Sequence, residues 1–303
     1  MHCGNLDATP RLGRDCGVQY GFIIYTAGDI NSIADLAVEA EDVGWDGIFY
    51  WDGIFLERHA EVGDHIYDPW VVLAAIATRT KQIRIGSVLT PLPRRRPWKV
   101  ARETVSLDHL SRGRLIFPVG LGFVPDGGFS RVGEVTDRHV RAELLDESLD
   151  IITGLWTGKP FHYSGRHFHL DEMTFLPPPV QSPRIPIWVA AVWPFEKSMR
   201  RAIKYDGVLP ETRNPDGTSA SVTPDAVRAV KAFIDEHRHS TSTFDIALEG
   251  QTPGDDLQQA QATVRAFGEA GLTWWLESLF DPERSASYDE VRQRIRQGPP
   301  RVD

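Results

Sequence analysis

The chain contains very little cysteine. Its 303 residues include only Cys3 and Cys16, both close to the N-terminus. Two thiols cannot form a disulfide framework and are too few for a structural zinc site. We therefore expect no bound metal, and we expect the protein to work in a reducing compartment, the cytoplasm.

Long apolar runs and an excess of basic charge are also missing. No segment approaches the roughly 20 apolar residues that a membrane helix needs, and residues 1–17 lack the apolar stretch of a secretory signal. We interpret residues 1–17 as a flexible N-terminal extension. The chain carries 42 acidic and 33 basic residues, a net charge of −9, which argues against a basic face for nucleic acid. The sequence thus predicts binding to neither membranes nor nucleic acids.

From residue 18 onward, short apolar runs alternate with longer amphipathic segments. Runs rich in β-branched and aromatic residues predict eight strands, at residues 18–25, 46–51, 83–89, 115–119, 187–191, 208–210, 244–248 and 273–279. Each strand is followed by a predicted helix, at residues 32–43, 69–77, 97–110, 143–156, 195–204, 224–237, 256–270 and 288–296. Strict alternation indicates parallel strands joined by right-handed crossovers.

Eight strand–helix units favour a closed barrel. An α/β chain with eight such units typically forms a TIM (β/α)8 barrel of roughly 250 residues, and we expect residues 18–303 to form one such domain. An open, doubly wound sheet is the alternative. No Gly-x-Gly-x-x-Gly motif follows the first predicted strand, which disfavours the dinucleotide-binding form of that alternative.

Three connections are longer than the few residues usual in this fold, at residues 122–141, 159–186 and 211–223. The first and the third follow strands. We therefore expect these insertion segments at the C-terminal face of the barrel, where the active sites of this fold are built.

Two blocks of sequence carry a family resemblance. The first runs from Thr90-Pro91 through residues 96–103 (RPWKVARE) and 107–115 (LDHLSRGRL) to residues 119–122 (VGLG). The second begins at Arg138 and continues through a helix to residues 163–165 (YSG) and 177–187 (PPPVQSPRIPI). In order and spacing, these blocks resemble the bacterial luciferase-like monooxygenases, a family of flavin- or deazaflavin-dependent oxidoreductases.

This resemblance implies a cofactor ring at the C-terminal ends of the strands. A bulge at Val88, Leu89 and Thr90 would press on the face of the ring. The cofactor phosphate would be held by the turn after the fourth strand, by an arginine, and by the turn and helix N-terminus after the fifth strand. In this chain those positions are Gly120, Leu121, Gly122, Arg138, Ala190, Ala191, Val192 and Trp193. The resemblance also implies that residues 159–186 cover the mouth of the barrel.

The chain departs from the family pattern at two positions. Members often have Asp-His at the end of the second strand, whereas Gly53 follows Asp52 here. An acid often follows Gly-x-Gly, where this chain has Phe123. Members that act on hydroxyl compounds with a deazaflavin often use that His and that acid, so their absence favours an oxygenase.

Carboxylates at the C-terminal ends of barrel strands are candidate catalytic groups. Asp52, Glu249 and Glu277 stand at the ends of the second, seventh and eighth predicted strands. We name these three residues as the catalytic candidates.

The sequence leaves three functional hypotheses open. The first is a homodimeric monooxygenase that uses reduced FMN and O2 on a small, apolar organic substrate, with a separate flavin reductase. The second is a reductase or dehydrogenase that uses the deazaflavin coenzyme F420. The third is a non-catalytic flavin-binding barrel subunit. We place the FMN monooxygenase first, and the fold alone does not identify the substrate.

Overall fold

The computed structural model describes residues 17–25, 28–54, 66–124, 127–214, 216–281 and 284–302, and the structural statements below refer to these residues. Both cysteines and all of the predicted N-terminal extension except Gly17 lie outside the described residues.

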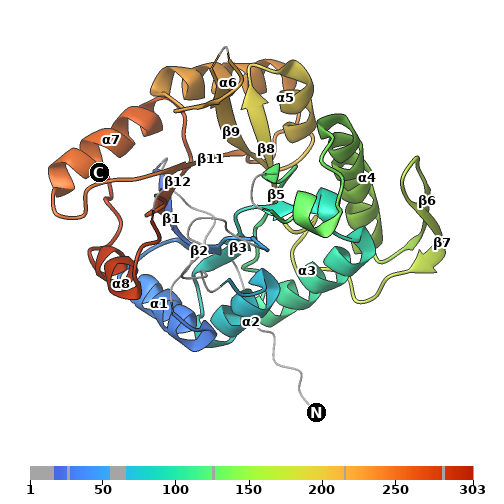
Figure 1. Ribbon diagram of the computed structural model, residues 1–303, viewed down its shortest axis with the longest axis horizontal. Coiled ribbons are helices and arrows are strands. Elements are labelled where there is room, and N and C mark those ends of the chain that lie inside the picture. The colour runs from blue at the N-terminus through green and yellow to red at the C-terminus, as the bar shows by residue number, and fades with distance from the viewer. Residues whose placement is uncertain are drawn as a thin grey trace.

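Parallel strands form a barrel inside a ring of helices, as the sequence predicts (Figure 1). The strand order is β3 (Arg84–Ser87), β2 (Gly47–Tyr50), β1 (Gln19–Ile24), β12 (Trp274–Ser278), β11 (Asp245–Gly250), β9 (Gly207–Arg213), β8 (Ile187–Trp193), β5 (Phe117–Gly120) and β4 (Thr90–Pro91). β3 lies within the third predicted strand, residues 83–89, and β4 follows directly after its predicted end. A parallel bridge between Ile85 and Leu115 joins β3 to the segment before β5 and completes the ring.

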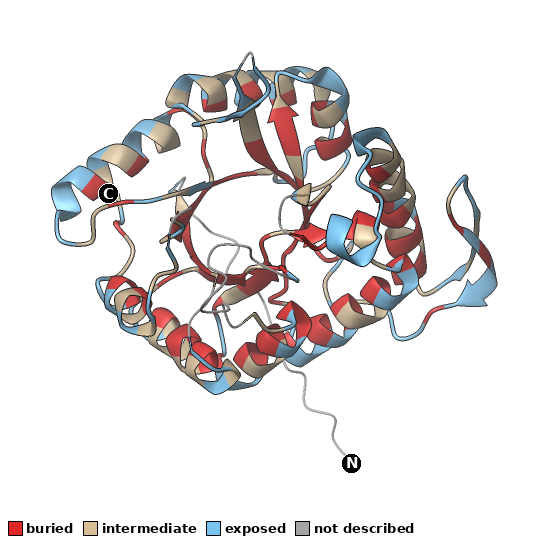
Figure 2. Cartoon of the chain, viewed as in Figure 1, coloured by how far each residue is buried: buried red, intermediate tan, exposed pale blue. Residues whose placement is uncertain are grey.

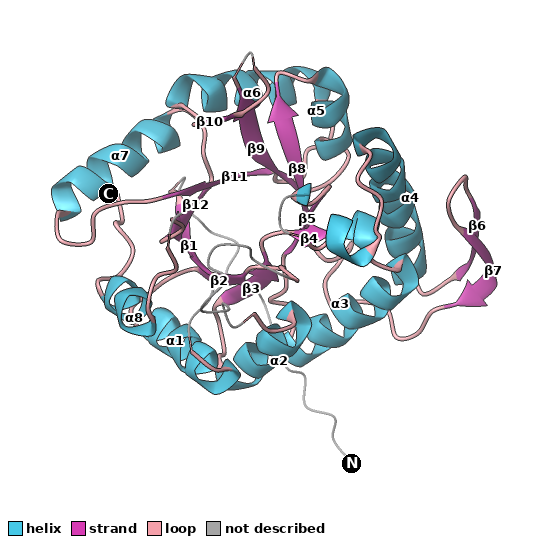
Figure 3. Cartoon of the chain, in the orientation of Figure 1, coloured by secondary structure: helices cyan, strands magenta, loops and turns pink. Residues whose placement is uncertain are grey.

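Each helix of the ring buries one face against the strands (Figures 2 and 3). The helices are α1 (Ile30–Asp42), α2 (Pro69–Arg79), α3 (Pro97–Ser111), α4 (Arg138–Trp156), α5 (Glu196–Ala202), α6 (Pro224–His237), α7 (Leu257–Glu269) and α8 (Tyr288–Arg296). Asp68 caps α2, and Pro69 occupies its first turn. Proline has no N–H group, but the helix needs no N–H donor at this position. None of the helices in the described ranges is long and apolar enough to span a membrane.

The core has two layers, one inside the barrel and one between the barrel and the helices. Phe49, Trp188 and Trp274 fill the inside of the barrel. Their ring centroids lie 5.8 Å apart for Phe49 and Trp188 and 5.3 Å apart for the two tryptophans. This aromatic cluster makes the barrel a packed core, so a ligand can enter only above it, at an end of the strands.

Two connections contain strands that the sequence did not predict. Residues 159–186 include the antiparallel hairpin of β6 (Pro160–Ser164) and β7 (His169–Thr174), and β9 continues past its predicted end to pair with β10 (Ser219–Ala220). The expectation that residues 159–186 cover the mouth is wrong, because the hairpin lies outside the helical ring beside α4 (Figure 1). The Glu147 carboxylate of α4 accepts hydrogen bonds from the backbone N–H groups of residues 166–168 and holds it there.

An ion-pair network joins the first helix to the last. The Glu39 carboxylate of α1 binds the guanidinium groups of Arg292 and Arg296 on α8 at 2.6 and 2.7 Å. Hydrogen bonds from Arg292 and then Arg296 lower the pKa of Glu39 to about 2. This pKa lies below the unfolded value of 4.5. The network therefore stabilises the fold above pH 4.5, and its contribution is lost as the pH falls from there through about 2.

We expect Glu39→Gln to lower the free energy of unfolding at pH 7 by about 1 kcal/mol, because both arginines are partly exposed and screened by water. The difference from wild type should shrink as the pH falls below 4.5. Urea unfolding at pH 7, 4 and 3 measures this change, with Asp42→Asn on the exposed end of α1 as the control. A difference that stays constant over this pH range would contradict the assignment.

Candidate functional site

The carboxyl ends of the strands form the mouth of the barrel. Alternate residues of each strand point inward, since side chains change face at every position. Ile23, Val88, Leu209 and Leu276 belong to the inner cluster, and Tyr25 and Ala190 pack against its upper side. The floor of the mouth is therefore apolar, as the site of a flat aromatic ring should be.

One wall of the mouth brings together several predicted cofactor residues. β3 ends at Ser87, the chain turns at Val88 and Leu89, and Thr90 pairs with Val119 of β5. The peptide bond between Val88 and Leu89 is cis. A turn at Val88 and Leu89 therefore interrupts the strand at the position that the resemblance assigns to the bulge.

Gly120 completes this wall. A Cβ atom at Gly120 would lie 3.0 Å from the Leu89 side chain and 3.1 Å from Ala190 Cβ, so the wall leaves no room for a side chain at this position. We call the surface formed by Val88, Leu89, Gly120 and Ala190 the cradle. Its side chains are all apolar, and Gly120 adds no side chain of its own.

The turn after the cradle is fixed by an arginine that the sequence analysis missed. Arg141 is buried, and its guanidinium donates to the carbonyl oxygens of Leu121 and Gly122, each at 2.9 Å. Arg138 was chosen instead, and it lies exposed at the first turn of α4 with its guanidinium 5.7 Å from the Phe195 ring centre. Both arginines stand on one face of the helix, three residues apart, and only the tertiary structure separates their roles.

The structure corrects the expected phosphate site after the fifth strand. Residues 190–193 are strand, not a turn, and α5 begins three residues later at Glu196. Ala191 is fully buried against the helices, and the N–H of Val192 donates to the Ser198 hydroxyl at 3.1 Å. Of the four residues named there, Ala190 lines the cradle, while Trp193 packs against the outer core.

Asp52 lies at the end of β2 and is committed to two arginines. Its carboxylate oxygens both accept from Arg95 at 2.7 Å, and one accepts from Arg94 at 3.3 Å. The side chains of Asp52 and Arg94 are 1% and 2% exposed. The charge of Asp52 is therefore matched by arginines that follow β4, and this pairing fixes the cradle side of the mouth.

Glu249 is the predicted carboxylate that the structure places in the mouth. Tyr25 Oη donates to it at 2.8 Å, and Ser278 is a second hydroxyl donor. Desolvation raises the pKa of Glu249, and these two hydrogen bonds oppose the rise. The side chain is itself exposed, so the desolvation comes from the surrounding barrel and not from complete enclosure.

Glu277 points away from the mouth, toward the helices. Its carboxylate accepts from Thr252 N, Thr252 Oγ1 and Trp275 Nε1, each at 2.8 Å, and pairs with Arg294 at 3.3 Å. The side chain is fully buried. This position lets Glu277 join β12 to α8, and it does not face a substrate in the mouth.

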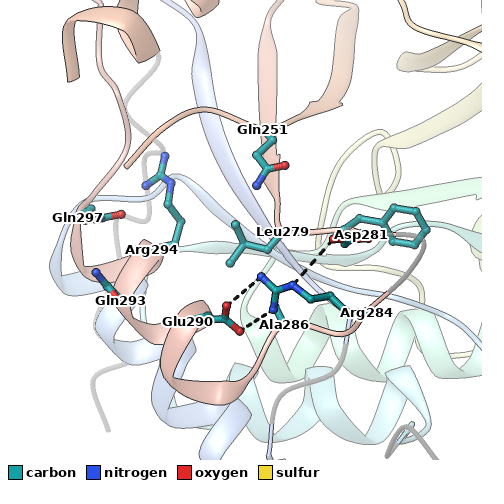
Figure 4. A pocket seen from close by; sticks show the side chains of 10 residues that line it. Gln251, Leu279, Asp281, Arg284, Ala286, Glu290, Gln293, Arg294 and Gln297 are labelled. Atoms are coloured by element: carbon teal, nitrogen blue, oxygen red, sulfur yellow. Dashed lines mark hydrogen bonds and ion pairs between the residues drawn. The ribbon is translucent and has the colours of Figure 1, made fainter. Parts of the chain in front are cut away.

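A pocket of about 510 Å³, the rim pocket, opens beside the segments that follow β11 and β12 (Figure 4). It separates α8 from the segments that follow β11 and β12. Its lining residues are Gln251, Leu279, Phe280, Asp281, Arg284, Ala286, Glu290, Gln293, Arg294 and Gln297. The Phe280 ring stands 4.9 Å from the Tyr25 ring, so the same aromatic side chain borders both the pocket and the mouth.

Comparisons with known proteins agree with this barrel and its mouth. The family model for luciferase-like monooxygenases matches residues 17–298. The chain belongs to this family. An F420-dependent glucose-6-phosphate dehydrogenase of Nakamurella multipartita is 26% identical over 266 residues, which cover 86% of this chain and 72% of that protein. Four further F420-dependent glucose-6-phosphate dehydrogenases are 28–33% identical, and the match spans about half of their length, 47–56%.

Solved structures of the luciferase-like family share the fold. An F420-dependent secondary alcohol dehydrogenase, solved with an F420–acetone adduct, has a TM-score of 0.74 at 17% identity, with 92% of this chain and 96% of that chain covered. A Baeyer–Villiger monooxygenase of Pseudomonas putida, solved with FMN, has a TM-score of 0.59 at 19% identity, with 78% and 67% covered. The two structures thus share this fold, one with an F420 adduct and the other with FMN.

Proposed function

We propose that this protein is an F420-dependent oxidoreductase that transfers a hydride between the deazaflavin and a small organic substrate. The sequence analysis placed reduced FMN first, and the relatives reverse that order, since the curated relatives reported above depend on F420. The observation that supports a bound ring is the cradle at the mouth, and the choice of F420 over FMN rests on these relatives. When bound, F420 would supply or accept the hydride at its ring.

The residues present fit a deazaflavin. Val88, Leu89, Gly120 and Ala190 offer an apolar face to its ring. Arg138 lies exposed on the α4 side of the mouth, and among the described residues its close contact is the Phe195 ring. We propose that Arg138 meets the phosphate of the cofactor chain, in place of the turn after β8.

We expect Gly120→Val to weaken F420 binding by about 100-fold or more, because the new methyl groups would stand where the ring rests against Leu89 and Ala190. Titration of the purified protein with F420, followed by cofactor fluorescence, measures the dissociation constant. Ala232→Val, on the exposed surface of α6, adds the same bulk away from the mouth and should leave binding unchanged. Unaltered F420 affinity in a folded Gly120→Val protein would disprove the position of the ring.

The FMN monooxygenase remains the second candidate, because Gly53 and Phe123 replace the usual acid–base residues of deazaflavin enzymes that act on hydroxyl compounds. A Cβ at Gly53 would lie 2.1 Å from the Trp51 ring, so a histidine there would also require Trp51 to move. Parallel titration with FMN separates the two proposals. Tight FMN binding with O2 consumption, and no binding of F420, would favour the monooxygenase with its flavin reductase.

We also propose that the protein works as a homodimer in the cytoplasm. Val71 of α2 and Trp98 and Leu110 of α3 are 54%, 37% and 45% exposed on two neighbouring helices, and we propose that they contact the second copy. Light scattering after size-exclusion chromatography measures the mass in solution. A mass of one chain at micromolar concentration would contradict the dimer.

A further inference from the structure

We infer that Tyr25 and Glu249 form the proton-transfer pair of this enzyme, and that the adjoining side of the mouth takes an uncharged carbonyl or hydroxyl compound. The inference rests on the proposed hydride transfer. A hydride that reaches a carbonyl carbon leaves negative charge on the oxygen, and a nearby acid must neutralise it. Gly53 and Phe123 cannot hold a proton, so the positions that often carry the acid and base in the family do not serve here.

Contacts from three directions fix the geometry of the pair. Tyr25 Oη donates to a Glu249 carboxylate oxygen at 2.8 Å. The Tyr25 ring lies between Trp51, 5.8 Å away, and Phe280, 4.9 Å away, measured between ring centres. Ser278 at the end of β12 donates a second hydrogen bond to the same carboxyl. Glu249 is thereby held at the mouth, across the barrel from the cradle strands.

The groups around Glu249 determine its protonation. Tyr25 of β1 and Ser278 of β12 donate hydrogen bonds to it, and Glu211 stands at the matching height on the neighbouring β9. Glu211 is itself paired with Arg213 at 3.1 Å. Desolvation raises the pKa of Glu249, and the two hydrogen bonds oppose this rise. Among the described residues, no cation lowers this pKa further. A larger fraction of this carboxyl is therefore protonated than in a free glutamate at the same pH.

The charges on this side of the mouth indicate the substrate class. Arg213 is paired with Glu211 and Arg284 with Glu290 at 2.9 Å, and Arg294, behind the mouth in the layer of helices, is paired with Glu277. A phosphate or carboxylate group would therefore have to break one of these pairs. An uncharged compound meets no such cost.

The rim pocket adds neutral hydrogen-bonding groups to this side. The side-chain amides of Gln251, Gln293 and Gln297 face it, and no hydrogen bond joins them to another residue of the described ranges (Figure 4). Amides both donate and accept, so they suit hydroxyl, ether or amide groups. We assign to this pocket the distal polar part of an uncharged substrate whose carbonyl reaches Glu249.

In the reducing direction, Glu249 is the proton donor. The O–H bond of the Glu249 carboxyl breaks, and its proton goes to the carbonyl oxygen of the substrate as the hydride reaches the carbonyl carbon. The π pair of the C=O bond becomes the new O–H bond, so the substrate is reduced by two electrons and the reduced deazaflavin is oxidised. Water returns to Glu249 the proton that the deazaflavin loses on oxidation.

The first test needs no turnover. Carbon-13 NMR of glutamate-labelled, cofactor-free protein follows each carboxyl with pH, and Glu249→Gln assigns the signal. We expect Glu249 to titrate above the ordinary range of a glutamate. Tyr25→Phe should move the titration further up, because the hydrogen bond from Tyr25 opposes the rise. An ordinary titration in wild type, or a downward move in Tyr25→Phe, would overturn the pair.

The second test measures catalysis with bound F420. We expect Glu249→Gln to lower kcat for reduction of uncharged ketones, cyclohexanone and acetophenone, by about 10²–10⁴-fold. The dissociation constant of F420 should stay within twofold, and Glu236→Gln on the outer face of α6 is the control. Full activity in Glu249→Gln overturns the pair, and a higher kcat/KM for glucose 6-phosphate than for both ketones overturns the uncharged substrate. Failure of the wild type to bind F420 would instead overturn the proposed function, while the NMR result would still stand.

Discussion

Glu277→Ala should lower the free energy of unfolding by about 3–5 kcal/mol, the cost expected when one partner of a buried ion pair is removed. The Arg294 side chain is 6% exposed and would keep its charge without its carboxylate partner. Thr252 and Trp275 would lose their acceptor as well, and unsatisfied buried donors are expensive. Because Glu277 joins β12, α8 and the segment after β11, its loss loosens the closing strand of the barrel.

Urea unfolding measures this change, with Glu290→Gln on α8 as the matched control. Glu290 pairs with the exposed Arg284 and accepts the Ser287 N–H at the start of α8, a capping contact that glutamine keeps, so Glu290→Gln should change stability far less than Glu277→Ala. A Glu277→Ala, Arg294→Met double variant should recover part of the stability, because no unpaired charge then stays buried. A Glu277→Ala protein as stable as wild type but without turnover would return Glu277 to the role of catalytic group.

The sequence predicted the fold well because the barrel depends on patterns that are local. Apolar runs and the caps between them are readable one segment at a time, as with Asp68 and Pro69 before α2. The predicted helix boundaries are wrong where polar residues extend a helix beyond its apolar part. α4 begins at Arg138 rather than at residue 143, and α1 begins at Ile30 rather than at residue 32, with the Asp29 carboxylate accepting from Ser32 N as its cap.

The candidate site was predicted less well because a strand does not reveal which of its faces is inward. Trp274 and Trp275 are both aromatic, yet Trp274 fills the barrel and Trp275 packs against the helices. The alternation of inward and outward side chains continues along β12, so Glu277 faces outward like Trp275. The sequence does not reveal which of the two sets faces inward. The same ambiguity made Ala191 look equivalent to Ala190. Tyr25 escaped notice because its partner, Glu249, lies 224 positions away.

Asp52→Ala should also destabilise the protein by about 3–5 kcal/mol, and it should weaken F420 binding at the same time. Asp52 holds Arg94 and Arg95, which belong to the segment that follows β4 and the turn at Val88 and Leu89. Arg94 also donates to the Asp52 carbonyl oxygen at 2.7 Å, so the segment is anchored to the end of β2 at two points. Removal of the carboxylate leaves two arginine charges close together, and their repulsion should displace the cradle.

The matched control is Asp35→Ala. Asp35 pairs with Arg79 on the surface, where the two side chains are 49% and 41% exposed, and its loss should cost less than about 1 kcal/mol. Urea unfolding and F420 titration of both variants decide between two roles for Asp52. A catalytic carboxylate would leave stability and cofactor affinity intact and remove turnover alone. The structure predicts instead that Asp52→Ala lowers stability and F420 affinity, and that activity falls as a consequence. The reason is that both carboxylate oxygens of Asp52 are already bound to Arg95.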